Sequence, residues 1–139
     1  MLSAFHVAAP VDTVFTNAGV LNPPDDPTRV GWWGAGALAG ASAGATVIVG
    51  HVDGPNGPGA LFRLVHARPG DRITVAGAAG ASKSYVVTSL TYHGKNNPLP
   101  QPLFTTFGPP HLTVISCGGT FDRTRDQYED NVIVQASPI

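Results

Sequence analysis

The sequence predicts an all-β protein, a closed eight-stranded β-barrel with long loops and one or two short helical turns. Short runs rich in β-branched and aromatic residues recur along the chain, and 17 Gly and 13 Pro separate them, as expected for short strands joined by turns. Helical periodicity is almost absent. With 139 residues the chain is long enough to bury a hydrophobic core, and we expect one domain spanning residues 1–139.

The first half of the chain is expected to contain three strands. Apolar residues on both sides of Pro10 predict two short strands around a bend within residues 3–16. Prolines exclude regular helix from residues 17–33, so this segment is expected to be a long loop that ends at two tryptophans. Gly, Ala and Ser fill residues 34–44, which predicts a flexible connection. Residues 45–51 form a continuous β-branched run, typical of a strand buried on both faces.

The second half is expected to complete the barrel. Residues 52–59 predict a turn-rich loop, and residues 60–64 a short strand or a helical turn. Residues 72–75 and 83–92 are expected to pair as a hairpin with its tip at residues 77–82. The remaining expected elements are a proline-rich loop at residues 96–102, a helical turn at 103–107, a strand at 111–117, a polar excursion at 121–130 and a last strand at 131–136.

Composition excludes several classes of function. The formal net charge is -1 and charged residues make up 12% of the chain, so electrostatic binding to nucleic acid or to an anionic membrane is not expected. No segment approaches the roughly 20 apolar residues that span a bilayer. The single cysteine and the scattered histidines give no metal-ligand spacing, and no glycine pattern suits a nucleotide phosphate, so we expect neither a metal nor a cofactor.

The single cysteine, Cys117, stands at the end of an apolar strand and is followed by two glycines. A thiol becomes a good nucleophile at neutral pH near a base or a cation that favours the thiolate. His51 stands at the end of the other strong strand, between a glycine and a Gly/Pro-rich loop, which suits a general acid or base. The alternative is an inert thiol, since a lone Cys in a strand is commonly a small core residue.

Several short motifs stand at the ends of the expected strands. They are Gly50-His51-Val52-Asp53, Phe62-Arg63-Leu64, Pro69-Gly70-Asp71, Leu112 to Asp122 with its Cys-Gly-Gly-Thr-Phe-Asp, and Tyr128 to Val134 with its Asp-Asn-Val. Together they resemble the sortase family, and the resemblance runs from residue 5 to the end. The Cys-Gly-Gly-x-Phe-Asp and Asp-Asn-Val-x-Val signatures, with Val30-Gly31-Trp32-Trp33, are most similar to the class F sortases of actinobacteria.

The resemblance implies an eight-stranded cysteine transpeptidase at the outer face of the cell membrane of Gram-positive bacteria, held by an anchor outside this chain. Such enzymes cleave a C-terminal sorting signal of the Leu-Pro-x-Thr-Gly (LPxTG) kind between Thr and Gly. They form a thioester on the cysteine and pass the acyl group to a cell-wall amine or to water. The resemblance implies that Cys117 is the nucleophile and that His51 is the acid or base. The other histidines, including His93, have no such match.

The sequence departs from the family at the usual arginine. Most sortases carry it at the start of the last strand, where this chain has Asn131. Asn donates hydrogen bonds but carries no charge, so the cationic role is expected to pass to Arg123, with Arg125 as the alternative. Otherwise both arginines are solvated loop charges. Asp53 is expected either to orient the imidazole or its loop, or to be an ordinary turn residue.

Two other functions remain open from the sequence. A peptidase with the same Cys117–His51 pair would release the peptide to water, and the residues alone do not decide which acceptor reaches the acyl-enzyme. The second alternative is a non-catalytic β-barrel of the cell envelope, in which Cys117 is a core residue.

Overall fold

The structure is a computed structural model that describes residues 1–4, 7–17, 20–76, 82–94, 101–125 and 127–139, with the backbone alone for residues 7, 17, 20, 101–102, 117–121 and 127. Its elements are almost all strands. In chain order they are β1 (Leu2–Ala4), β2 (Val7–Ala9), β3 (Val11–Val14), β4 (Thr16–Asn17), β5 (Val20–Leu21), β6 (Val30–Trp33), β7 (Ala45–Gly50), β8 (Asp53–Gly54), β9 (Gly57–Pro58), the 3₁₀ turn η1 (Leu64–His66), β10 (Arg72–Ala76), β11 (Ser82–Gly94), the 3₁₀ turn η3 (Gln101–Phe104), β12 (His111–Asp122) and β13 (Gln127–Pro138).

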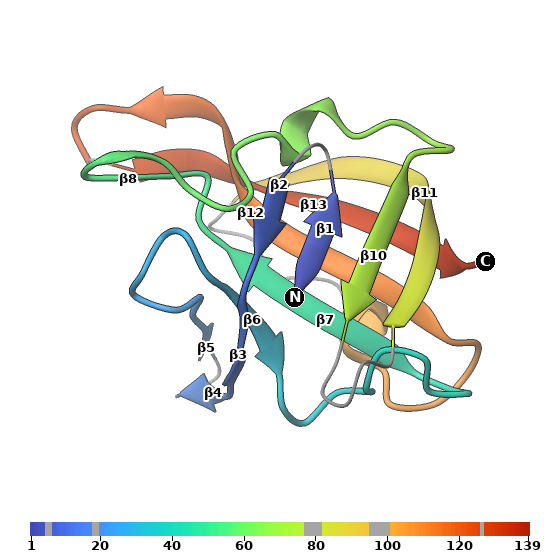
Figure 1. Cartoon of the computed structure of the whole chain (residues 1–139). Helices are drawn as coiled ribbons and strands as arrows, with labels where there is room; N and C mark the ends of the chain where they lie inside the picture. Colours follow the sequence, from blue (N-terminus) through green and yellow to red (C-terminus); the bar gives the residue numbers. More distant parts are fainter. Residues whose placement is uncertain (5–6, 18–19, 77–81, 95–100, 126) are drawn as a thin grey trace.

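One sheet of nine strands curls into a nearly closed barrel. Its strand order is β2-β1-β10-β11-β13-β12-β7-β6-β3. The two strands at the ends of this order, β2 and β3, are joined by Pro10 alone, so the chain itself brings the two edges of the sheet together. Figure 1 shows β1, β2 and β10 in front of β7, β12 and β13. Side chains from both groups of strands, including Leu2, Ile73 and Val114, belong to one buried apolar cluster. The predicted all-β barrel is confirmed, with nine strands in the main sheet rather than eight.

The central strands β7, β12 and β13 are buried on both faces. Inside the barrel, a large apolar cluster includes Ile48, Val114 and Val132. On the outer face of the same strands, a second cluster joins Val49 to Ile115, Ile133 and Leu103 of η3. An edge-to-face pair of Trp33 and Phe104, with ring centroids 5.5 Å apart, packs beside this second cluster. Burial on both faces explains why these strands are continuous apolar runs rather than alternating ones.

Several local expectations are confirmed. The hairpin pairs β10 with β11 from Arg72↔Val86 to Ala76↔Ser82, although most of its predicted tip, residues 77–81, lies outside the described residues. A helical turn is present as η3 at residues 101–104, two residues before the predicted 103–107, so the end of the predicted proline-rich loop at residues 96–102 belongs to it, and residues 96–100 lie outside the described residues. Residues 60–63 form turns rather than a strand, and the 3₁₀ turn η1 begins at Leu64. Among the described residues, no helix is long and apolar enough to cross a bilayer.

Four segments differ from the prediction. Instead of the two strands predicted within residues 3–16, the chain forms β1, β2, β3 and the start of β4, and the loop predicted at residues 52–59 contains the short strands β8 and β9. Residues 17–33 were expected to form a loop, but β5 and β6 lie within them, because Trp32 and the residues around it pair with both β3 and β7. The polar excursion expected at residues 121–130 is the end of a long hairpin, since β12 continues to Asp122 and β13 begins at Gln127. These two strands pair with each other beyond the end of β7. Backbone hydrogen bonds form with any residue type, so this part of the hairpin does not require apolar residues.

The buried hydroxyl of Thr113 gives a stability prediction. Thr113 is fully buried in β12, and its hydroxyl has no hydrogen-bond partner among the described residues. An unsatisfied buried hydroxyl is destabilising, so Thr113→Val is expected to raise the free energy of unfolding by about 1 kcal/mol in urea denaturation. Thr88→Val is the control, because the exposed Thr88 hydroxyl donates to the carbonyl of Gln135 at 3.2 Å. A loss of stability in Thr113→Val would show that its hydroxyl is satisfied.

Candidate active site

The parallel pairing of β7 with β12 sets the end of β7 level with the middle of β12. Their register runs from His111↔Ala45 to Ile115↔Val49. Two residues beyond the last pair stand His51, directly after β7, and Cys117 within β12. Cys117 is in turn paired with Asn131 of β13. The structure therefore pairs the backbone of Cys117 with that of Asn131, and continuing the β7–β12 register by two residues sets position 51 level with position 117.

These three positions continue the outer face of the sheet. Val49, Ile115 and Ile133 share the outer apolar cluster, and alternate residues of a strand share a face. The next row on that face thus consists of positions 51, 117 and 131. We call these three positions the active-site row. The neighbouring strand β11 places His93 opposite Asn131, a histidine for which the sequence gave no signal.

The chain around His51 is held by backbone contacts. The carbonyl of His51 accepts a hydrogen bond from the N–H of Leu61 at 3.0 Å, and the N–H of Gly59 donates to Val52 at 3.0 Å. A Cβ built on Gly59 would overlap the carbonyl oxygen of His51. A Cβ on Gly50 would lie 2.8 Å from the Leu61 side chain. Glycine is therefore required at position 59, where the backbone leaves no room, and at position 50 a larger residue would have to displace the Leu61 side chain.

The imidazole of His51 is half-buried and contacts the proline-rich loop at residues 22–29. Its Nε2 lies 3.0 Å from the carbonyl oxygen of Pro24. A carbonyl only accepts, so Nε2 carries the proton and donates it. In the neutral ring this leaves Nδ1 as the basic nitrogen. Sequence reasoning missed Pro24, because a backbone carbonyl leaves no mark in the residue type.

Side-chain hydrogen bonds hold this loop in place. The guanidinium of Arg29 donates two hydrogen bonds of 2.7 Å to the carboxylate of Asp12 in β3. The carboxylate of Asp26 accepts from the N–H and the hydroxyl of Thr28, at 2.9 and 2.7 Å. Hydrogen bonds from Arg29 lower the pKa of Asp12, and those from Thr28 lower the pKa of Asp26, below their ordinary values. Both carboxyls are therefore ionised at neutral pH, as these contacts require.

Asp53 lies in β8 and joins two hairpins. Its carboxylate accepts a hydrogen bond of 2.8 Å from the phenolic hydroxyl of Tyr128 in β13. This contact links the loop after His51 to the long β12–β13 hairpin. It fits the expected role of Asp53 in positioning the His51 loop, whereas a direct effect on the imidazole stays a prediction.

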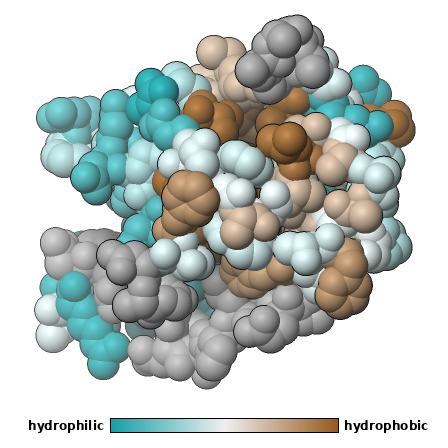
Figure 2. Space-filling view, turned by 90° about the horizontal axis from the view of Figure 1, so that it is seen from below, coloured by the Kyte–Doolittle hydropathy of each residue, from teal (hydrophilic) through white to brown (hydrophobic). Residues whose placement is uncertain are grey.

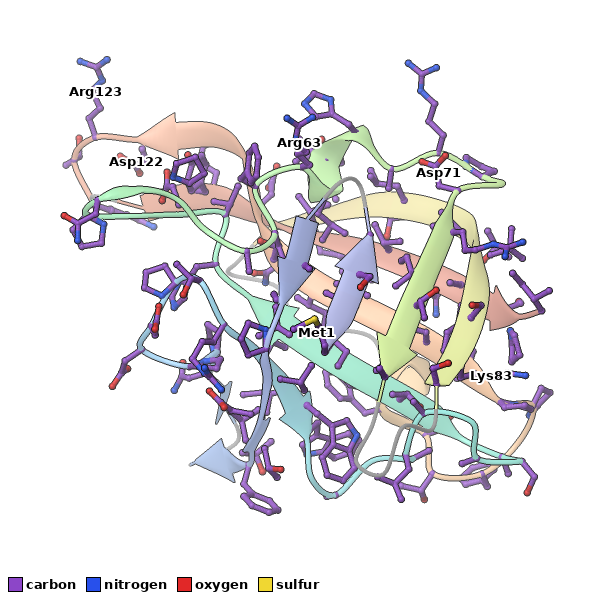
Figure 3. All side chains as sticks on the ribbon, in the orientation of Figure 1. Met1, Arg63, Asp71, Lys83, Asp122 and Arg123 are labelled. Carbon is purple, nitrogen blue, oxygen red and sulfur yellow. The ribbon has the colours of Figure 1, made fainter. Side chains whose placement is uncertain are left out.

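Both candidate arginines lie at the far end of the β12–β13 hairpin. Figure 3 shows the exposed Arg123 side chain pointing away from the barrel. Arg125 is 60% exposed, and its Nε lies 3.8 Å from the carboxylate of Asp122. Five steps along β12 lead from Cys117 to Asp122, a span of at most about 16 Å at 3.3 Å per step. The structure thus brings neither arginine into the active-site row.

The row combines the groups that acyl transfer needs. A thiol is a nucleophile, an imidazole transfers protons, and the amide of Asn131 is a neutral hydrogen-bond donor for a developing oxyanion. Asn131 is half-buried, so its amide is partly shielded from water.

A family model described as "Sortase domain" matches residues 2–139 of this chain. No curated protein sequence matches it. Among solved structures, the chain resembles sortase C1 from Streptococcus agalactiae with a TM-score of 0.76 and 16% identity, covering 99% of this chain and 65% of that one. It resembles a lid mutant of sortase A from Corynebacterium diphtheriae with a TM-score of 0.72 and 17% identity, covering 99% of this chain and 68% of that one.

A third structure, the complex of Streptococcus agalactiae sortase C1 with MTSET, matches with a TM-score of 0.65 and 18% identity. This match covers 81% of the present chain and 55% of the other. The chain thus spans between about half and two thirds of the length of these three structures. At these identities the likeness concerns the fold.

The glycine at position 59 gives a test of how His51 is positioned. Because an added Cβ would overlap the His51 carbonyl, Gly59→Ala is expected to lower the free energy of unfolding by about 2 kcal/mol and to shift the imidazole NMR signals of His51. Asn56→Ala, in the exposed turn of the same loop, is the matched control and should change neither. Unchanged His51 signals in Gly59→Ala would show that the loop adapts without moving the imidazole.

Proposed function

The chain belongs to the sortase family, and we propose that it is a cysteine transpeptidase with Cys117 as nucleophile and His51 as general acid and base. The observation that carries the proposal is the parallel pairing of β7 with β12 as far as Ile115↔Val49, because two further residues along each chain lead to His51 and Cys117. These two positions come from distant parts of the sequence, and the pairing supports their assignment to one site. We assign the enzyme to class F on the motifs around Cys117 and Asn131.

In the proposed reaction, the thiolate of Cys117 attacks the carbonyl carbon of threonine in a peptide of the LPxTG kind. The Thr–Gly C–N bond then breaks, and the imidazolium of His51 gives its proton to the departing glycine amine. The product is a thioester on Cys117. An incoming amine then loses a proton to the imidazole as it attacks the thioester, and the thiolate leaves.

The oxyanion formed at the threonine carbonyl needs hydrogen-bond donors. Asn131 is the proposed donor within the row, since it is paired with Cys117. Arg123 is the proposed cation, with Arg125 as the alternative. Either arginine would have to be carried over the row by a bend of the β12–β13 hairpin. The turn residues Asp122–Arg125 lie beyond the end of β7, where the main sheet has no third strand among the described residues and the Tyr128–Asp53 hydrogen bond ties the hairpin to β8.

The proposed substrate is the sorting signal of a secreted protein, and the proposed acceptor is an amine of the cell wall. We place the reaction at the outer face of the cell membrane, as in the family. With water as the acceptor, the enzyme would be a peptidase. Measuring cleavage with and without an added amine distinguishes transfer from hydrolysis.

Removing either reactive group is expected to abolish cleavage. With an LPxTG peptide, Cys117→Ala should show no turnover, and His51→Ala should be slower by about 10² to 10⁴-fold. Chromatography with and without hydroxylamine or triglycine separates the transfer product from the hydrolysis product. His66→Ala is the control, because His66 is an exposed histidine of η1 outside the three positions of the row. Substantial turnover by Cys117→Ala would refute the proposal, and hydrolysis alone would favour a peptidase.

Three variants, measured in parallel, identify which side chain donates hydrogen bonds to the oxyanion. We expect Arg123→Ala and Asn131→Ala each to slow acylation of Cys117 by at least about tenfold, because each removes a proposed donor to the transition state. Arg125→Ala and the control Arg68→Ala, exposed before β10, should be nearly silent. Single-turnover mass spectrometry of the acyl-enzyme gives the rates. If Arg125→Ala is the slow variant, the cationic role belongs to Arg125, and if only Asn131→Ala is slow, neither arginine takes part.

A further inference from the structure

The segment at residues 22–29 joins β5 to β6 and carries the carbonyl that contacts the imidazole of His51. We call it the proline segment, because three of its eight residues are prolines. Four of the eight are exposed, and none belongs to either buried apolar cluster. Figure 2 shows hydrophilic residues along the left side of the molecule, the side on which Figure 1 draws this segment. Its position therefore depends on specific contacts rather than on burial in the core.

An ion pair with β3 holds the last residue of the proline segment. The guanidinium of Arg29 places two nitrogens 2.7 Å from the two carboxylate oxygens of Asp12. Two parallel hydrogen bonds restrain direction as well as distance. The next N–H, of Val30, donates to the carbonyl of Pro10 at 3.0 Å. Both side chains of the pair are 39% exposed, so its main effect is on geometry, because exposed ion pairs add little stability.

Pro24 and Pro27 fit against glycines of neighbouring elements. A Cβ built on Gly31 of β6 would lie 3.1 Å from the ring of Pro24, and one on Gly54 of β8 would lie 2.5 Å from the ring of Pro27. The carbonyl of Pro27 also accepts a hydrogen bond of 2.7 Å from the N–H of Ala60. Both partners of Pro27 belong to the chain that follows β7. The proline segment thus contacts the active-site imidazole and also the loop behind it.

A tight turn connects the ion pair to these prolines. The N–H of Arg29 donates to the carbonyl of Asp26 at 3.1 Å, with Pro27 at the second position of the turn, which suits its fixed φ. The carboxylate of Asp26 accepts two further hydrogen bonds from Thr28. With this turn restrained, a shift of Arg29 would be passed on to the prolines rather than absorbed between them.

The Pro24 carbonyl is the contact that orients the His51 ring. It lies 3.0 Å from Nε2, and among the described residues the imidazole has no other hydrogen-bond partner. The backbone contacts of His51 fix its Cα but leave the two side-chain torsions free. Holding Nε2–H leaves Nδ1 as the nitrogen that can take or give a proton.

We propose that Arg29 and Asp12 are positioning residues for His51, which act through the Pro24 carbonyl so that Nδ1 exchanges the proton with the peptide. This inference rests on the proposed role of His51 as general acid and base. An imidazole released from Pro24 would offer its proton in the productive direction for only part of the time, and small misplacements of a catalytic group are costly. Neither residue belongs to the active-site row, so the effect falls on kcat rather than on KM.

The kinetic test compares variants of the ion pair with an LPxTG peptide. Arg29→Ala and Asp12→Ala should each lower kcat about tenfold with KM unchanged, and the double variant should lose no more than either single one. Arg29→Lys, which keeps the charge but not the fork, should lose less. Asp71→Asn is the matched control with wild-type kcat, because its carboxylate also holds an exposed turn, through the N–H of Arg68 at 2.9 Å. Wild-type kcat in both alanine variants, or losses confined to KM, would overturn the proposal.

NMR of the free enzyme reads the position of the imidazole without any turnover. The hydrogen-bonded proton on Nε2 of His51 should exchange with water at least about tenfold faster in Arg29→Ala and Asp12→Ala, but not in Asp71→Asn. Unchanged exchange in the alanine variants, or a wild-type ring that carries its proton on Nδ1, contradicts the positioning role even if kcat falls. Faster exchange in a protein whose wild type cleaves no peptide would support the positioning role and refute the proposed function.

Discussion

The parallel pairing of β7 with β12 is the constraint on which the rest of the structure depends. A parallel pair needs both strands covered on both faces, and here the barrel interior covers one face while η3 and the Trp33–Phe104 pair help to cover the other. The same pairing fixes which residues stand level at the strand ends. A shift of one residue would turn the apolar set of β12 to the wrong faces, so packing of the core also fixes the register of His51 against Cys117.

Strands that are specified by the burial of apolar residues could be predicted from the sequence. Strands that are held by backbone hydrogen bonds alone could not. The strands β7, β10, β11, β12 and β13 carry apolar or alternating residues, so their existence could be predicted from residue type. The end of the β12–β13 hairpin is polar and is held by pairing between its own two strands, which leaves no apolar pattern. Likewise β6 followed a proline-rich stretch that indicated a loop, but its Trp32 packs against the inner core and its backbone pairs on both sides.

The candidate site shows the same division. Cys117 and His51 could be found because their residue types are rare and stand at the ends of strong strands. Pro24 could not be found, because it contributes only its carbonyl oxygen, and that oxygen reaches His51 through a loop fixed by Arg29 and Asp12. Asn131 departs from the family arginine, and the structure offers no charged side chain at that position. Because Asn131 is uncharged, the proposed positive charge has to come from an arginine in the turn of the β12–β13 hairpin. That turn lies beyond the end of β7.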